Sequence, residues 1–214
     1  MKVKYWMTKD PVTIGPDETI NEAARIMQER GFRRLPVMDG GRLVGLVTRR
    51  NILDAQPSAA STLSVHEARY LVDKLKVSDV MRRSPVTVAS EDDVLKAVME
   101  GHQKRIGAFP VVDDGRLVGI VTVSDLFNLI MHILGAGDRE DFIYLEGRKD
   151  EVATPGYLSK LAGAIAWKNI AVLNFLSFPS KEDPEKTMVL IRISSGHRAE
   201  AVELLGSGGF KVLN

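Results

Sequence analysis

The sequence predicts an α/β fold in which one α/β unit occurs twice and a smaller βαββαβ domain follows. The clearest evidence is a repeat. Pro11-Val12-Thr13 returns 74 residues later as Pro85-Val86-Thr87, and residues 41–48 return as residues 115–122. A repeat of this length is one supersecondary unit used twice. Because two such units with the same polar groups can build two related pockets, the repeat indicates a ligand-binding protein.

The composition is typical of a globular protein and excludes several classes of function. Of the 214 residues, 44% are hydrophobic and 27% are charged, and the formal net charge of +1 gives no general attraction for nucleic acid or anionic lipid. The absence of cysteine excludes disulfides, thiolate nucleophiles and iron–sulfur clusters. The start of the chain lacks the apolar stretch of a signal peptide, and the most apolar run, residues 126–134, is too short to cross a bilayer. We therefore expect a cytoplasmic protein.

Local patterns predict each element of the first unit. A short strand is expected at residues 12–14. Thr19 and Glu22 then form a capping box that starts a helix, and Gly31 is placed to end it. The remaining elements, in chain order, are a strand at 35–38, a hairpin turn at 39–41, a strand at 43–47 and a helix from residue 50.

The second unit repeats this order. Asp93 is the expected N-cap of its helix, and Asp113-Asp114-Gly115 is its hairpin turn. Between the units, Ser64 and Glu67 form a capping box that would begin a connecting helix. We therefore divide the chain into a first unit at 1–56, a connecting loop and helix at 57–76, a second unit at 77–134 and a last domain at 139–214.

The last domain follows a different pattern. Thr154-Pro155 is a favoured helix start, and a stripe of apolar residues would form the buried face of that helix: Leu158, Leu161, Ala162 and Ile165. The other elements are strands at 142–145, 172–178, 188–193 and 210–213 and a helix at 198–205. This βαββαβ order is the split-βαβ motif of a ferredoxin-like α/β sandwich.

The repeated unit resembles the CBS domain. Leu35-Pro36-Val37 followed by residues 45–51 matches Phe109-Pro110-Val111 followed by residues 119–125. Both end in glycine, two apolar residues, threonine, two variable residues, and then asparagine or aspartate. The pair, roughly residues 1–130, resembles a tandem of CBS domains, often called a Bateman module. The resemblance implies a non-enzymatic regulatory protein that binds AMP, ADP, ATP or another adenosyl compound, with no metal and no other cofactor.

The residues at the end of each repeat fit the recognition of a ribose. Asp125 lies at a strand-to-helix corner, where its carboxylate can accept hydrogens from both ribose hydroxyls. Asn51 at the matching position can accept one and donate one, so the two pockets should differ. Thr48 and Thr122 add hydroxyl groups beside them. The alternative for these four residues is a role in helix capping alone.

The resemblance also places basic residues next to a ligand phosphate. CBS units often carry a basic residue before the Leu-Pro pair, where this chain has Arg33-Arg34 in the first unit and Gly107-Ala108 in the second. The alternative for these charges is a solvated loop. The candidate nucleotide-binding residues are Thr13, Arg33, Arg34, Pro36, Thr48, Asn51, Thr87, Ile106, Gly107, Pro110, Thr122 and Asp125.

The last domain resembles the ACT domain. Its Pro155-Gly156-Tyr157-Leu158 matches the Pro-Gly-x-Leu turn of that family, although Ala153 stands where an acidic residue is usual. The resemblance implies a module that pairs edge to edge and often binds an amino acid, with Pro155, Gly156 and Tyr157 as the candidate effector site. A CBS tandem followed by an ACT-like domain resembles the acetoin-utilization regulatory protein family.

The resulting prediction is a sensor that is not an enzyme. It would form a homodimer or tetramer, bind an adenosyl ligand, and act on an unidentified regulated protein, without membrane contact. One alternative is a structural dimerisation protein with vestigial pockets. The other is a nucleic-acid-binding regulator, supported only by Arg33, Arg34, Arg49 and Arg50 and disfavoured by the near-zero net charge. His66-Glu67 is the closest approach to a zinc-enzyme motif, and it lacks the second histidine.

Overall fold

The computed structural model describes residues 1–56, 70, 72–135 and 141–213 and contains two compact units, Met1–Phe127 and Asn128–Asn214. The predicted start of the connecting helix, Ser64 to Glu67, lies outside the described residues. The domain division at residues 56, 76, 134 and 139 stays a prediction. None of the described helices is long and apolar enough to span a membrane.

The first repeat has the predicted hairpin flanked by helices. Thr19 caps the first helix by accepting a hydrogen bond from the Glu22 N–H, and Gly31 ends it with a φ of 69°. The capping box is only half formed, because the Glu22 carboxylate binds Arg25 at 2.6 Å instead of reaching back. The elements are η1 (Val3–Tyr5), β1 (Thr8–Lys9), α1 (Ile20–Arg30), β2 (Arg34–Asp39), β3 (Arg42–Thr48) and α2 (Arg49–Asp54).

The predicted strand at residues 12–14 is wrong. This segment forms a single parallel bridge between Ile14 and Val37, closed by the Ile14 N–H to the Pro36 carbonyl and the Met38 N–H to the Ile14 carbonyl. Pro11 and Pro16 flank the segment and have no N–H to extend the pairing. A true strand, β1, lies four residues earlier, where no strand was predicted.

The second repeat matches the first closely. Asp93 caps α5 by accepting from the Leu95 N–H, as predicted, and Asp114 and Gly115 form the hairpin turn with φ values of 48° and 77°. Both hairpins carry a bulge at the same place, between Val37 and Met38 and between Val111 and Val112. The elements are α4 (Val77–Val80), β4 (Arg82–Arg83), α5 (Val94–Lys104), β5 (Ala108–Asp113), β6 (Arg116–Thr122) and α6 (Val123–Leu134).

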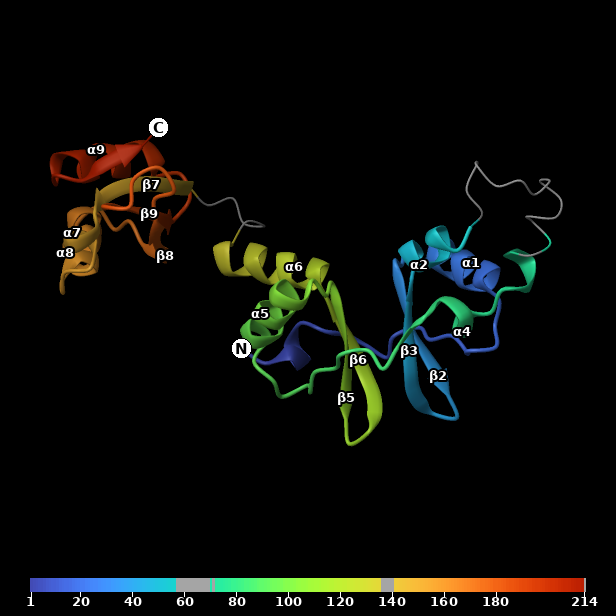
Figure 1. The fold of residues 1–214 in the computed structure, drawn as a ribbon. Helices are drawn as coiled ribbons and strands as arrows, with labels where there is room; N and C mark the ends of the chain where they lie inside the picture. The colour runs from blue at the N-terminus through green and yellow to red at the C-terminus, as the bar shows by residue number, and fades with distance from the viewer. Residues whose placement is uncertain (57–69, 71, 136–140, 214) are drawn as a thin grey trace. The chain divides into compact units, whose positions relative to one another are not determined.

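The two repeats exchange their first strands. Strand β1 of the first repeat pairs with β6 of the second, with Thr8 opposite Ile120, and β4 of the second repeat pairs with β3 of the first, with Arg82 opposite Leu46. Each repeat therefore completes the other's three-stranded sheet, β2-β3-β4 or β1-β6-β5. Figure 1 shows the two hairpins next to each other, each with its own pair of helices. Leu46, Ala108 and Ile120 form a buried cluster that joins the two sheets.

The Asn128–Asn214 unit contains the predicted βαββαβ order around one antiparallel sheet with strand order β10-β7-β9-β8. Its core includes Ile143, Leu161, Ile191 and Leu205, all fully buried. A short extra helix, α7, follows the first strand. The elements are β7 (Asp141–Arg148), α7 (Lys149–Val152), α8 (Tyr157–Ala166), β8 (Val172–Pro179), β9 (Lys186–Ile193), α9 (Arg198–Ser207) and β10 (Lys211–Leu213).

Two details of the predicted first helix in this unit are wrong. The helix begins at Tyr157 rather than at Thr154-Pro155, because Gly156 takes the N-cap position with a φ of 95°. The Thr154 hydroxyl donates instead to the Asp150 carbonyl at 2.7 Å. The buried stripe is Tyr157, Leu161 and Ile165, and Leu158 is 47% exposed. Tyr157, Leu161 and Ile165 are spaced four residues apart, so Tyr157 takes the core position expected for its neighbour.

Candidate functional site

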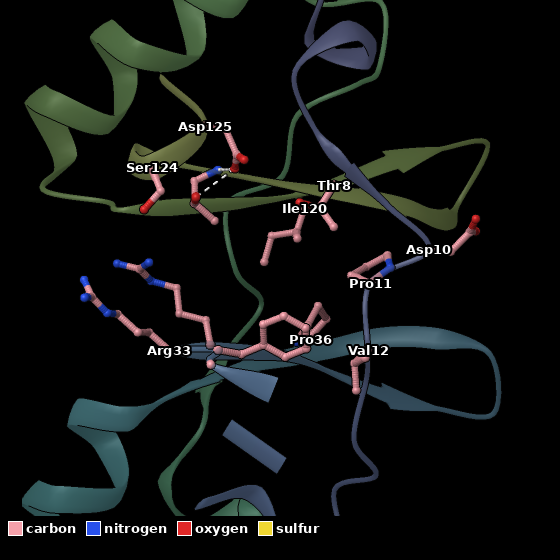
Figure 2. A pocket seen from close by; sticks show the side chains of 13 residues that line it. Thr8, Asp10, Pro11, Val12, Arg33, Pro36, Ile120, Ser124 and Asp125 are labelled. Carbon is pink, nitrogen blue, oxygen red and sulfur yellow. Dashed lines mark hydrogen bonds between the residues drawn. The ribbon is translucent and has the colours of Figure 1, made fainter. Parts of the chain in front are cut away.

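A cavity of about 370 Å³ lies in the Met1–Phe127 unit and is lined by residues of both repeats. Strand exchange builds it, because β1 crosses to β6 and carries the start of the first repeat to the end of the second. Figure 2 shows Arg33, Pro36 and Ile120 in the space between the two hairpins, whereas the Asp10 side chain points away from it. The lining residues are Thr8, Asp10, Pro11, Val12, Gly31, Phe32, Arg33, Arg34, Pro36, Ile120, Thr122, Ser124 and Asp125.

One end of the cavity is apolar. Pro11, Val12, Pro36 and Ile120 lie together there, away from the arginine side chains (Figure 2). Pro36 is fixed in place because its carbonyl accepts the Ile14 N–H at 3.1 Å. A flat ring that enters this end would remove its apolar faces from water, and this burial is favourable.

The middle of the cavity carries Thr122 and Asp125, at the junction of β6 and α6. One carboxylate oxygen of Asp125, Oδ2, accepts the backbone N–H and the hydroxyl of Thr122, both at 2.7 Å. The other oxygen, Oδ1, has no hydrogen-bond partner in the described part of the chain, so it can accept a ligand hydroxyl. Asp125 can therefore cap the start of α6 with one carboxylate oxygen and bind a ligand with the other.

The third part of the cavity is basic. Arg33 and Arg34 line it, and neither forms an ion pair with any described residue. Burial of Arg34, with a further contribution from the neighbouring Arg33 charge, lowers the pKa of the Arg34 guanidinium. A guanidinium has no accessible neutral form at ordinary pH, so it remains charged and favours an anion beside it. Figure 2 shows the Arg33 side chain on the side of Ser124 and away from Pro11.

The structure brings five of the candidate residues into this cavity: Arg33, Arg34, Pro36, Thr122 and Asp125. Thr48 and Asn51 form the equivalent pair at the junction of β3 and α2 without lining it. Thr13 and Thr87 are exposed, because Ile14 and Val88 beside them take the buried positions. Ile106, Gly107 and Pro110 also lie outside its lining, although a Cβ atom on Gly107 would come within 2.6 Å of Arg34 Nη2.

Sequence reasoning missed several lining residues: Thr8, Asp10, Pro11, Val12, Gly31, Phe32, Ile120 and Ser124. Some of them had a visible signal, since Pro11-Val12 recurs as Pro85-Val86. Thr8 had none, because its place depends on the pairing of β1 with the other repeat.

The candidate effector site of the last domain is only partly assembled. Tyr157 lines a small cavity of about 190 Å³ with Glu151, Lys186 and Lys211, whereas Pro155 and Gly156 do not. Burial, together with the charge of Glu151, raises the pKa of the Tyr157 hydroxyl. The described residues contain no cluster of three or more acidic or histidine side chains that could hold a metal ion.

Comparison with known proteins identifies both copies of the repeat as the same domain. The CBS domain profile matches residues 3–58 and 77–132. The chain is 34% identical over 134 residues to a CBS domain-containing protein of Dictyostelium discoideum, covering 62% of this chain and 92% of that protein. It is 31% identical over 140 residues to inosine-5′-monophosphate dehydrogenase of Korarchaeum cryptofilum, covering 65% of this chain. The match spans only 26% of that dehydrogenase, so it does not extend to the enzyme as a whole.

Solved structures show the same fold over the tandem. A proposed acetoin utilization protein from Vibrio cholerae is 28% identical with a TM-score of 0.54, covering 64% of this chain and 95% of that one. A CBS domain pair solved with 5′-methylthioadenosine and S-adenosyl-L-methionine is 30% identical with a TM-score of 0.51, covering 61% and 99%. A protein in complex with AMP is 27% identical with a TM-score of 0.52, covering 62% and 97%. The chain therefore belongs to the CBS domain family, and its two CBS domains form the tandem pair known as a Bateman module.

Proposed function

We propose that the protein is a non-enzymatic sensor that binds an adenosyl nucleotide in the cavity between its two CBS domains. The observation that carries this proposal is the order of groups in that cavity: an apolar end at Pro11 and Pro36, the Asp125 carboxylate in the middle, and Arg33 beyond it. Adenine, ribose and phosphate present the complementary groups in the same order. A cavity of about 370 Å³ is also within the usual size range of small-molecule sites.

The similar CBS pairs support this ligand class, since they were solved with AMP, S-adenosyl-L-methionine and 5′-methylthioadenosine. A regulatory role then requires that ligand binding is coupled to a change of conformation. A ligand shifts a conformational equilibrium only as far as it prefers one conformation, so binding at Asp125 would act on an unidentified partner through the start of α6. No catalytic step is part of this proposal.

We further propose that the Asn128–Asn214 unit is an ACT-like module that joins subunits or binds a second effector near Tyr157. Its support is the edge strand β8, Val172–Pro179, which contains no charged residue. Natural proteins usually protect exposed edge strands with charges, so an uncharged edge favours pairing with another strand. A homodimer or tetramer is the expected assembly.

A thermal-shift screen over AMP, ADP, ATP, NAD, S-adenosylmethionine and cyclic dinucleotides tests the ligand proposal. A ligand at 100 times its dissociation constant should stabilise the protein by about 2.7 kcal/mol. Asp125→Asn should reduce the shift, and Asp114→Asn, in the exposed hairpin turn of the same domain, is the matched control. If none of these compounds raises the unfolding temperature, a structural role with vestigial pockets becomes the better explanation.

A further inference from the structure

A second cavity, of about 430 Å³, lies between α1 and α2 of the first CBS domain. Met27 and Gln28 line it from α1, and Arg49 and Ile52 line it from α2. It shares three lining residues with the nucleotide cavity, the segment Gly31-Phe32-Arg33. The two cavities therefore adjoin at this segment, and Arg33 belongs to both.

The second cavity carries positive charge without a counterion. Arg33 and Arg49 line it, no acidic residue does, and neither arginine forms an ion pair with a described residue. The Arg49 N–H donates to the Arg33 carbonyl at 2.9 Å, which holds the two residues next to each other. The next residue behaves differently, because Arg50 binds the Asp54 carboxylate at 2.8 Å. The charge of Arg49 is thus available to a ligand, whereas that of Arg50 is compensated within α2.

This arrangement occurs in only one of the two domains. The residues 74 positions after Arg33 and Arg49 are Gly107 and Val123, which carry no charge. The backbone bond is nevertheless repeated, from the Val123 N–H to the Gly107 carbonyl at 3.2 Å. Since the backbone contact does not require arginine at either position, the two charges of the first domain are not explained by the fold.

We propose that Arg33 and Arg49 form a polyphosphate subsite, so that the ligand class is adenosine di- or triphosphate rather than the monophosphate. The inference rests on the proposed function. With the ribose at Asp125, the first phosphate lies beside Arg33 and Arg34, and the following phosphates extend past Arg33 toward Arg49. Each added phosphate brings negative charge next to an uncompensated guanidinium, and arginine binds phosphate oxygens through strong charge-assisted hydrogen bonds. The same positive charges disfavour a cationic ligand such as S-adenosylmethionine.

Calorimetric titration of AMP and ATP into the 214-residue chain and its variants tests the subsite. The wild type should bind ATP more tightly than AMP. Arg49→Gln should weaken ATP binding about tenfold, a loss expected for one charge-assisted bond, and should change AMP binding less than about twofold. Arg50→Gln removes the same charge one residue away, from a side chain that lines neither cavity, and should leave both affinities unchanged.

The outcomes separate this inference from the proposed function. Equal wild-type affinities for AMP and ATP, or equal effects of Arg49→Gln and Arg50→Gln, overturn the subsite while leaving an adenosyl site in place. If neither nucleotide binds the wild type, the proposed function itself fails. Inorganic tripolyphosphate provides a further check, because it should compete with ATP in the wild type and compete less well in Arg49→Gln.

Discussion

Asn51 and Asp125 make the same two hydrogen bonds in the two CBS domains and leave opposite groups for a ligand. Asn51 Oδ1 accepts the N–H and the hydroxyl of Thr48 at 3.0 and 2.7 Å, and Asp125 Oδ2 accepts the same groups of Thr122. Within the described residues, the unengaged atom is the Nδ2 donor in Asn51 and the Oδ1 acceptor in Asp125. Both residues therefore cap a helix, but only Asp125 offers an acceptor to a ribose hydroxyl.

Asp125→Asn should weaken binding of the adenosyl ligand without unfolding the domain. The amide oxygen can still accept the two bonds from Thr122, as Asn51 does in the other domain. The ligand then meets a donor in place of a charged acceptor, and a hydrogen bond to a charged group contributes about 1.5–3 kcal/mol. Calorimetry measures the affinity, and the unfolding temperature reports on the cap.

Asn51→Ala is the informative comparison for that variant. It removes the corresponding cap, but Asn51 does not line the nucleotide cavity. We expect the affinity to fall less than in Asp125→Asn. Unchanged affinity in both variants would leave helix capping as their only role.

Local signals predicted the ends of α1 and the start of α5, although they misplaced the strand at residues 12–14 and the start of α8. Thr19 and Gly31 mark the ends of α1 because capping depends on residues three or four positions apart, and the same holds for Asp93. The bonds between Asp125 and Thr122 could be predicted for the same reason, since their motif is a continuous segment that occurs in both repeats. The binding role of Asp125 stays a prediction. The position of β1 could not be predicted, because the strand that stabilises it lies in the other repeat. For the same reason nothing in the sequence indicated that Thr8 lines the cavity.

Close packing at the exchanged strands gives a test of the fold. A Cβ atom on Gly119 would lie 2.6 Å from Met7 Sδ and 3.0 Å from the Thr8 carbonyl oxygen. The methionine can move, but the Thr8 backbone is held by its pairing with β6. Gly119→Ala should therefore lower the free energy of unfolding by about 1–3 kcal/mol, as measured by urea denaturation.

Gly15→Ala is the matched control for Gly119→Ala, because its Cβ atom would meet only Glu18 at an ordinary 3.5 Å. We expect Gly15→Ala to lower the free energy of unfolding clearly less than Gly119→Ala does. Equal effects of the two substitutions would show that the exchanged strand is not tightly packed on Gly119.

Glu146 should make the stability of the last unit depend on pH. It accepts a hydrogen bond from Lys211 at 2.5 Å and pairs with Lys186 at 3.2 Å, linking β7 to β10 and β9. The Lys211 bond, aided by Lys186, holds the pKa of the Glu146 carboxyl below its usual value. A lowered folded pKa adds stability above the unfolded pKa, and this stability is lost as the pH falls through the folded value.

Glu146→Gln should therefore destabilise the unit at about pH 7 and have less effect at an acid pH below the lowered folded pKa, where the wild-type carboxyl is also neutral. Hydrogen exchange of the β7 and β10 amides in the two proteins measures the difference. An effect of the same size at both pH values would indicate lost packing rather than lost charge.

Apolar side chains on α5 and α6 provide a test of the predicted homodimer. Leu95 and Met99, one turn apart on α5, are 55% and 63% exposed, and Phe127 on α6 is 63% exposed. Large exposed apolar groups of this kind often mark an interface.

The double substitution Leu95→Glu with Met99→Glu places two charges on this surface, and the cost of burying them should separate the subunits. Light scattering should then give a lower mass than for the wild type, and the 23.6 kDa of one chain if this surface is the whole interface. Tyr5→Glu, at an exposed aromatic residue elsewhere in the same unit, controls for added charge and should leave the assembly intact. A wild-type mass of one chain at micromolar concentration would refute the homodimer.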